Sequence, residues 1–285
     1  MFDLHCHMLP GVDDGAADLN TALEMARCAR DQGVRVVACT PHILPGLYHN
    51  TGPGIRTAVL ELRARLADAG IDLELVAGAD NHISPTFLAD LKRGHLLAIA
   101  RSRYVLVEPP HHVAPQRLDV LLFELMAAGY VPILTHPERL SWVQSKADTI
   151  KDFARRGVWL QVTSGSLLGR FGRTARYWAD KLVSEGHVQL LASDAHDMDR
   201  RPPDLEKGAR AAEVLVGAQM SRHMVFTAPA AVLQNAPPPE SPGVLARQHI
   251  EEPSDDRPAR LTPVDDGVAG RLRRFLDRRE QSVGS

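Results

Sequence analysis

Histidine is the residue type that stands out in this sequence, with 13 copies among 285 residues. His5 and His7 are separated by one residue near the N-terminus, and Asp194 and His196 repeat that spacing far along the chain. In an extended segment, residues i and i+2 point to the same side, so each pair can present two ligand atoms to one ion. Imidazole together with carboxylate suits Zn²⁺, Fe or Mn²⁺. The two pairs therefore indicate a transition-metal site.

The other candidate ligands follow short apolar runs that have the composition of β-strands. A histidine, aspartate or glutamate stands just after six of seven such runs, whereas chance placement would scatter these residues over the loops. The candidate ligands are His5, His7, His42, Asp80, Glu108, His136, Asp194 and His196. Eight ligands are too many for one tetrahedral ion but suit two or three ions that share a bridging carboxylate. We expect Glu108, on a central strand, to be that bridge.

The remaining histidines do not fit this pattern. Those expected at the surface or in packing are His49, His82, His95, His187, His223 and His249. His111 and His112 follow Glu108 in a proline-rich loop, where they could line the mouth of the site, although a surface role is favoured.

Residues 1–235 alternate β-like runs with amphipathic helical stretches, and this frame must position the ligands. The expected strands are Phe2–Leu4, Val34–Ala38, Asp72–Val76, Tyr104–Val107, Val131–Leu134, Val158–Val162 and Val188–Leu191. Strict alternation implies parallel strands joined by right-handed crossovers, and seven units predict a TIM-like (β/α)7 barrel, close to the (β/α)8 type but short by one unit. In such a barrel the chemistry collects at the carboxyl ends of the strands, where the candidate ligands stand. A doubly wound open sheet is the alternative, although no G-x-G-x-x-G motif follows the first run.

Composition limits the other classes. Residues 236–285 are rich in proline and charge and predict a flexible, disordered tail, in which 268–279 could form a basic amphipathic helix. The segment 268–279 is expected either to remain solvated and mostly unfolded or to dock onto a partner or a membrane surface. The net charge of -2 argues against nucleic-acid binding. The apolar stretches are all too short for a membrane-spanning helix, so we expect no stable membrane insertion. Three cysteines without a signal-peptide pattern favour the cytoplasm.

Longer motifs around these ligands resemble the PHP superfamily, named for polymerase and histidinol phosphatase domains. The opening FDLHCHMLPGVDDGAAD is similar to the first motif of the CpsB/YwqE-type bacterial manganese-dependent protein-tyrosine phosphatases. Further matches are ACTPH, VAGAD, YVLVE, ILTHPER and LASDAHDMDRRPP, spread over residues 1–235. The sequence departs from the family pattern at Asp80, where glutamate is usual, and at Cys6, where serine is common.

The resemblance implies a distorted TIM-like (β/α)7 barrel of the PHP type, with a trinuclear site that holds manganese- or iron-type metals. It further implies that the protein hydrolyses phosphotyrosine on another protein, by attack of a hydroxide that bridges the metal ions. The expected partner is a tyrosine kinase that controls capsule or exopolysaccharide synthesis. Two or three divalent ions are expected, with Mn²⁺ favoured over Fe or Zn. Because no cysteine stands in a C-x5-R loop, a cysteinyl-phosphate mechanism is not supported.

Three further residues are expected to act on the phosphate ester. Arg139 and Arg201 lie on the same predicted rim and match family positions that contact phosphate, for which the guanidinium fork is suited. Asp13 and Asp14 follow His7, and one of them could protonate the leaving phenolate or help to hold an ion. The resemblance favours Asp14, and a helix-capping turn is the alternative.

Three other functions remain open from the sequence. A PHP phosphoesterase could act on a small phosphate monoester, such as histidinol phosphate or a nucleotide, instead of on a protein. A metal-stabilised adaptor without activity would bind the kinase only, and Asp80 leaves this reading open. An amide hydrolase is disfavoured because no lysine follows a central strand to serve as a carbamylated bridge.

Overall fold

The structure, a computed structural model, describes residues 1–242 and shows parallel strands alternating with helices. Its strands are β1 (Phe2–Cys6), β2 (Val36–Cys39), β3 (His42–Ile43), β4 (Glu74–Ala77), β5 (Asp80–His82), β6 (Tyr104–Glu108), β7 (Val131–Thr135), β8 (Trp159–Thr163) and β9 (Leu190–Ala192). Each of the seven expected runs overlaps one of these strands, which extends one or two residues farther toward its carboxyl end. β3 and β5 are additional short strands that continue the directions of β2 and β4 after brief interruptions.

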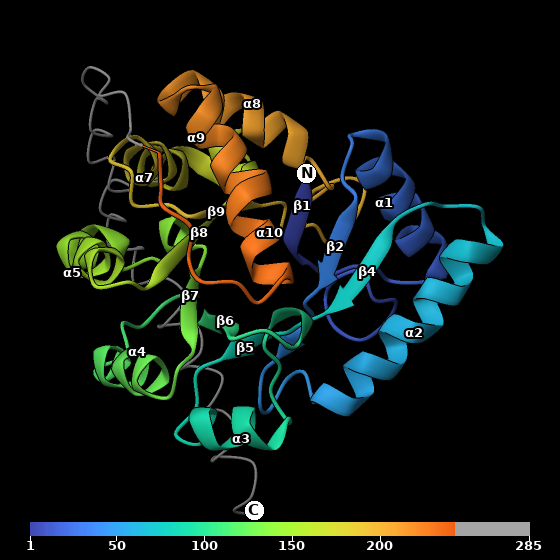
Figure 1. The fold of residues 1–285 in the computed structure, drawn as a ribbon, viewed down its shortest axis with the longest axis horizontal. Helices are drawn as coiled ribbons and strands as arrows, with labels where there is room; N and C mark the ends of the chain where they lie inside the picture. The colour runs from blue at the N-terminus through green and yellow to red at the C-terminus, as the bar shows by residue number, and fades with distance from the viewer. Residues whose placement is uncertain (243–285) are drawn as a thin grey trace, which may run out of the picture. The chain divides into compact units, whose positions relative to one another are not determined.

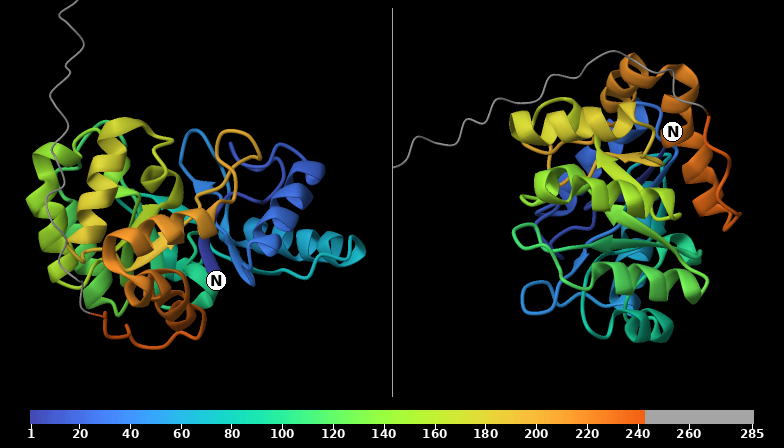
Figure 2. Two further views of the ribbon diagram at one scale, coloured as in Figure 1. Left: turned by 90° about the horizontal axis from the view of Figure 1, so that it is seen from above. Right: turned by 90° about the vertical axis from the view of Figure 1, so that its left-hand side faces the viewer.

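Helices lie on the outer side of the curled sheet (Figure 1, Figure 2). The α-helices are α1 (Leu19–Asp31), α2 (Gly52–Asp68), α3 (Phe87–Arg93), α4 (Leu118–Ala127), α5 (Val143–Arg155), α6 (Ser164–Leu167), α7 (Gly172–Ser184), α8 (Leu205–Val216), α9 (Ala218–Arg222) and α10 (Ala228–Leu233). Shorter turns are η1 (Ile99–Arg101), η2 (Pro137–Arg139) and η3 (His223–Thr227). None of the helices within residues 1–242 is long and apolar enough to cross a bilayer.

The strands form two hydrogen-bonded sheets that together make one distorted barrel. Their orders are β1-β2-β4 and β3-β5-β6-β7-β8-β9, with every pairing parallel. The two ends of the barrel meet where Cys6 bridges Ala195 and the Asp194 amide donates to the His5 carbonyl at 2.8 Å. The predicted closure between the first and last strands is therefore observed, and the doubly wound alternative is wrong.

The barrel interior changes from apolar to polar along the strand direction. Leu106 on β6, Ile133 on β7 and Trp159 on β8 belong to one buried apolar cluster inside the barrel. The next inward residues on those strands are Glu108, Thr135 and Gln161, because side chains alternate between the two faces of a strand. Ala228 and Val232 of α10 join the apolar cluster, so this helix closes the end opposite to the polar layer.

The predicted tail lies mostly outside the described residues. Residues 236–242 continue beyond α10 without helix or strand, and the Tyr104 hydroxyl donates to the Ala236 carbonyl at 2.8 Å. The segment 243–285, which contains the expected helix 268–279, is not among the residues described.

Candidate metal centre

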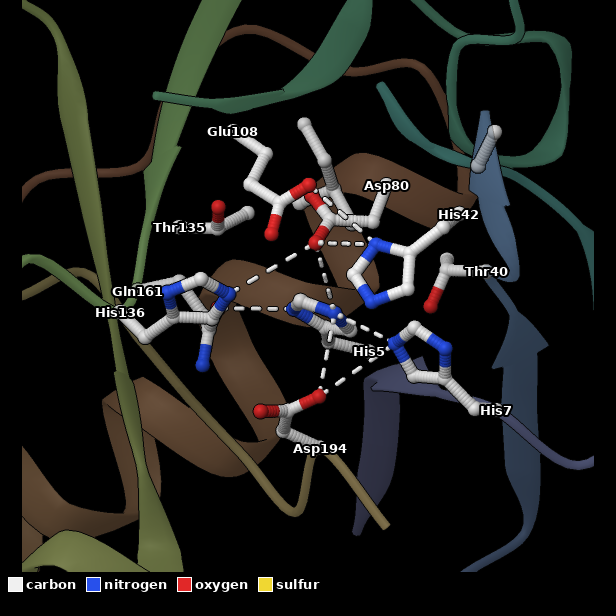
Figure 3. A network of polar contacts seen from close by, with 12 residues as sticks. His5, His7, Thr40, His42, Asp80, Glu108, Thr135, His136, Gln161 and Asp194 are labelled. Carbon is white, nitrogen blue, oxygen red and sulfur yellow. Dashed lines mark hydrogen bonds and ion pairs between the residues drawn. The ribbon is translucent and has the colours of Figure 1, made fainter. Parts of the chain in front are cut away.

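Residues from both ends of the barrel sheet meet in one buried cluster (Figure 3). The register between β1 and β2 shifts between Asp3 and Cys6, as in a β-bulge, and such a bulge can re-aim a side chain. His5 and His7 come together with 3.1 Å between their Nε2 atoms. Asp194 Oδ1 lies 3.4 Å from each of these nitrogens, so two segments almost 190 residues apart present three ligand atoms to one point.

Asp80 stands at the centre of the cluster. Its Oδ2 atom lies 3.5 Å from His5 Nε2, 3.6 Å from His42 Nδ1 and 3.6 Å from His136 Nε2. Glu108 Oε2 approaches His42 Nδ1 at 3.2 Å on one side of this centre. These distances give the central position to Asp80, whereas the bridging role of Glu108 stays a prediction.

A third group forms at the open side of the cluster, around Asp14. Its Oδ1 atom lies 3.6 Å from His42 Nε2 and 3.6 Å from His196 Nε2, and the His7 and His196 rings are 3.9 Å apart. Asp14 is 46% exposed, whereas His196 is buried. The structure therefore brings Asp14 among the candidate ligands, a position that an ion-holding residue would need.

Asp13 and Gln161 hold two of the histidine rings by their far nitrogens. Asp13 Oδ2 lies 2.7 Å from His7 Nδ1, and the His42 amide donates to the same oxygen at 2.9 Å. Gln161 Oε1 lies 2.9 Å from His5 Nδ1. Partners of this kind orient a ligand histidine and select its tautomer. The sequence analysis favoured Asp14 of the two aspartates through the resemblance, and it assigned no role to Gln161.

Several buried polar atoms of the cluster lack a hydrogen-bond partner within residues 1–242. They include both carboxylate oxygens of Asp80, Asp194 Oδ1, His42 Nδ1 and His196 Nε2. Leaving such atoms unpaired in a protein interior costs free energy unless something else satisfies them. Five sets of three or four ligand atoms lie within 4.8 Å of one another, and all eight candidate ligands and Asp14 occur in them. This donor set of imidazoles and carboxylates fits several divalent ions.

Charge within the cluster shifts the pKa values of its members in opposite directions. Burial alone lowers the pKa of His5, but the charges of Asp194 and Asp80 outweigh it and raise the pKa to about 9. Burial opposes ionisation of Asp194, yet Arg201 and His5 hold its pKa well below the usual value. Burial and the His7 charge lower the pKa of His196 to about 4. The carboxylates therefore stay ionised at neutral pH, as metal ligands must.

Two arginines border the cluster beside Asp194. Arg139 Nη1 and Arg201 Nη2 both donate to Asp194 Oδ2, the latter at 2.6 Å. The Phe171 ring lies beneath them, with its centroid 4.3 Å from Arg139 Cζ and 5.9 Å from Arg201 Cζ. Both predicted phosphate-binding residues thus point to the same edge of the cluster. Phe171 was not predicted, because its sequence neighbourhood carries no metal or phosphate motif.

Two histidines expected away from the site lie against Glu108. His82 Nδ1 is 3.4 Å from Glu108 Oε2, and His111 Nε2 is 3.8 Å from Glu108 Oε1. His82, expected at the surface or in packing, thus lies beside a candidate ligand, and His111, which could line the mouth of the site, is 31% exposed there. A signal for His82 was present, since Asp80 and His82 repeat the i, i+2 spacing of the two ligand pairs. His249 lies outside the described residues.

A family model described as "Capsular polysaccharide synthesis, CpsB/CapC" matches residues 1–234 of the chain. Among curated proteins, tyrosine-protein phosphatase YwqE of Bacillus subtilis is 35% identical over 70% of this chain and 79% of its own length. The putative tyrosine-protein phosphatase CapC of Staphylococcus aureus is 32% identical over 71% of this chain and 79% of its own length.

A solved structure gives the same picture. It belongs to work described as crystal structures of YwqE from Bacillus subtilis and CpsB from Streptococcus pneumoniae, unique metal-dependent tyrosine phosphatases. It matches this chain with a TM-score of 0.81 and 31% identity, and the match covers 87% of this chain and 100% of that chain.

Proposed function

Because the chain belongs to the CpsB/CapC capsular polysaccharide synthesis family, we propose that it is a metal-dependent phosphatase that hydrolyses phosphotyrosine. The named relatives are tyrosine phosphatases, and the solved relative is described as metal-dependent. The observation that carries the proposal is the cluster itself. It combines buried, unpaired ligand atoms around Asp80 with two arginines at its edge. Metal-assisted hydrolysis of a phosphate ester uses both, ligands to hold the ions and guanidinium groups to bind the phosphoryl oxygens.

The eight candidate ligands hold the ions in this proposal, and Asp14 joins them. Divalent ions bound there supply a Lewis acid and lower the pKa of water so that it becomes a nucleophile at neutral pH. Burial opposes ionisation of Asp14, but His196 and the other histidines hold its pKa below the usual value. An ionised carboxylate cannot donate a proton, so we assign Asp14 to ion binding in preference to protonation of the leaving group.

Arg139 and Arg201 bind the phosphoryl oxygens and orient the ester. Their guanidinium groups share one carboxylate oxygen of Asp194, which places both beside the ligand cluster. A guanidinium has five N–H donors, so each arginine keeps donors for a phosphate group after it has bonded Asp194. Phe171 beneath both groups favours cations over its ring face and limits where they can move.

We propose two or three ions per chain and Mn²⁺ as the physiological metal, with Fe and Zn as alternatives. The mixed imidazole and carboxylate donor set supports a borderline metal over Ca²⁺ or Mg²⁺, which prefer oxygen alone. Aspartate at position 80 shortens one ligand by a methylene relative to the usual glutamate. Metal analysis of protein purified after growth with each metal tests this assignment.

For substrate and partner, we propose a phosphotyrosine-bearing protein, such as the tail of a bacterial tyrosine kinase that controls polysaccharide export, met in the cytoplasm. The test pairs elemental analysis with assays on a phosphotyrosine peptide, histidinol phosphate and a nucleotide monophosphate. We expect the peptide to give the highest kcat/KM and EDTA to abolish turnover. A clear preference for a small ester would identify a phosphoesterase instead, and bound metal with no turnover on any ester would identify an adaptor.

A further inference from the structure

A cavity separate from the metal centre lies between α2, β4 and η1. Its volume is about 410 Å³, which is within the range of small-molecule sites. α2 packs against β4 on the outer side of the sheet (Figure 1), and η1 contacts the same strand. None of the eight candidate metal ligands lines this cavity, and neither does Arg139 or Arg201. The cavity is therefore not part of the site described above.

Three arginines line the cavity from two sides. Arg56 and Arg63 come from α2, where residues seven apart share one face, and Arg101 comes from η1. The residues that line the cavity include no aspartate or glutamate. Among the described residues, no carboxylate forms an ion pair with any of the three guanidinium groups. The cavity thus gathers positive charge without neutralising it.

The arginines keep most of their donors free for a ligand. Arg63 Nε and Nη2 both donate to the Leu75 carbonyl of β4, the former at 2.8 Å, and Arg56 Nη2 donates to the Gly94 carbonyl at 3.5 Å. Within residues 1–242, the Arg101 guanidinium has no polar partner. Since each guanidinium has five N–H donors, the backbone carbonyls use only a part of the available set.

The backbone that carries Arg101 is strained. Ala100 has φ 51° and ψ 30°, and Arg101 has φ 59°, so two successive residues with side chains adopt the left-handed conformation. That conformation is unfavourable for L-residues other than glycine. The turn is held by the Ser102 amide, which donates to the Ile99 carbonyl at 2.8 Å. Residues in such conformations cluster at binding sites, and Ala100 and Arg101 both line the cavity.

The remaining walls are apolar, with Val59, Leu91 and Leu96 among them and Tyr130 also lining the cavity. We propose that this cavity binds an organic phosphate with an apolar or aromatic body, about the size of a nucleoside diphosphate. The guanidinium groups would hold the phosphates through paired N–H donors, and the apolar walls would cover the body. This inference does not depend on the proposed phosphatase activity.

The experiment is calorimetric titration of the metal-loaded, full-length protein with ADP, with inorganic pyrophosphate and with adenosine. We expect ADP to bind more tightly than either part, and its affinity to fall as salt is raised. Arg56→Gln and Arg101→Gln should each weaken ADP binding about tenfold or more. Arg65→Gln is the matched control, because Arg65 lies on the same helix but outside the cavity, 3.9 Å from Asp68.

Turnover of p-nitrophenyl phosphate and the melting temperature report whether each variant keeps its fold and metal centre. We expect both to match the parent protein in the Arg56→Gln and Arg101→Gln variants. An equal effect of Arg65→Gln would show non-specific attraction and overturn the proposal. Absence of ADP binding at millimolar concentration, or purely competitive inhibition by ADP that the cavity variants leave unchanged, would also overturn it. Pyrophosphate that binds as tightly as ADP would refute the apolar part of the assignment.

Discussion

The two oxygens of Asp194 have different neighbours, and this division links metal binding to phosphate binding. Oδ1 lies 3.4 Å from the Nε2 atoms of His5 and His7, whereas Oδ2 accepts hydrogen bonds from Arg139 and Arg201. Replacing an arginine removes a contact to Oδ2 and leaves the face of Asp194 toward the histidines in place. Loss of phosphate binding should therefore be separable from loss of metal.

Arg139→Ala tests that separation. We expect kcat/KM for p-nitrophenyl phosphate to fall on the order of 10²–10³-fold, the effect of removing one charge-stabilising donor from an active site. Bound metal, measured by elemental analysis, should stay near the parent level. Arg156→Ala, just after α5, is the control and should change neither quantity, because Arg156 pairs only with Asp152 of that helix, at 2.6 Å, among the described residues.

His136→Ala provides the contrast, because His136 Nε2 faces Asp80 and occurs in two of the candidate ligand sets. This variant should lose metal and turnover together. If Arg139→Ala instead lost metal in the same proportion as activity, Arg139 would be a structural support of the cluster and not a phosphate-binding residue.

Phe171 is a positioning residue in our interpretation, since it touches the arginines and not the ligand atoms. Phe171→Leu should weaken inhibition by inorganic phosphate about 2- to 30-fold, because a cation–π contact stabilises by about 0.5–2 kcal/mol. Phe171→Tyr keeps the ring and should restore inhibition to the parent level. A purely structural role would predict a lower melting temperature with unchanged phosphate inhibition.

These residues also show what the sequence could reveal. The candidate ligands were recognisable because each stands at a strand end, and strand ends of a parallel barrel meet at one rim. Phe171 follows α6 in a segment without such a pattern, and only the packing shows that its ring lies under two arginines that are more than 60 residues apart. Its role depends on contacts that no local spacing encodes.

At the scale of elements, the segment between β1 and α1 determines how the histidine pair is held. Asp13 Oδ2 in this segment lies 2.7 Å from His7 Nδ1, and the Ala16 amide donates to the His7 carbonyl at 3.0 Å. Gly15 fits against His7 so closely that an added Cβ would lie 2.5 Å from His7 Cβ and 2.9 Å from Asp13 Oδ1. The close approach explains a glycine at this position.

Gly15→Ala should therefore disturb metal binding through the backbone. We expect the free energy of unfolding to fall by about 1–3 kcal/mol, the usual effect of overpacking, and metal affinity to fall with it. Gly54→Ala near the start of α2 is the matched control, because its Cβ would meet only Thr51 Oγ1, at 3.3 Å. Denaturant unfolding and metal titration measure both effects. Equal metal affinity in the two variants would contradict the proposed close fit.

The pattern of strands was predictable, but their interruptions were not. Apolar runs and alternating helices identify the seven main strands, because burial on both faces needs continuous apolar residues. β3 and β5 have only two and three residues, too few for a periodicity, and each begins with a polar candidate ligand, His42 or Asp80. The register shift in β1, between Asp3 and Cys6 on either side of His5, likewise leaves no mark in the sequence.

At the scale of the whole molecule, the candidate metal centre connects the first and last strands of the barrel. Asp3 Oδ1 accepts from the Ser193 amide at 3.1 Å, and the His7 amide donates to the Ala195 carbonyl at 2.8 Å. Bound ions would add further links between His5, His7 and Asp194 across the same junction. Metal should therefore stabilise the closed barrel, although backbone hydrogen bonds already close it.

Chelation with EDTA followed by dialysis should lower the melting temperature without unfolding the protein at 25 °C. An ion present at 100 times its dissociation constant stabilises by about 2.7 kcal/mol, which corresponds to a shift of about 5–10 °C for a domain of this size. Differential scanning calorimetry measures the shift, and adding back Mn²⁺ should reverse it. An unchanged melting temperature together with full turnover would contradict a metal centre at this junction.

The extent of the folded unit can be tested by truncation, because Asn235 and Ala236 both make hydrogen bonds to the barrel and lie on opposite sides of the predicted boundary. The predicted boundary at residue 235 would keep Asn235, whose Oδ1 atom accepts from the Arg103 amide at 2.9 Å, but would remove the Ala236 carbonyl that pairs with the Tyr104 hydroxyl.

A chain of residues 1–242 keeps both contacts, the described barrel and every candidate site residue. It should hydrolyse p-nitrophenyl phosphate at the parent rate and unfold at the parent denaturant midpoint. A chain of residues 1–235 should be equally active but less stable by about 1–3 kcal/mol, since Ala236 makes two hydrogen bonds, one from the Tyr104 hydroxyl to its carbonyl and one from its amide to the Ala231 carbonyl. If the chain of residues 1–242 failed to fold or lost turnover, the segment 243–285 would belong to the catalytic unit and the proposed boundary would be wrong.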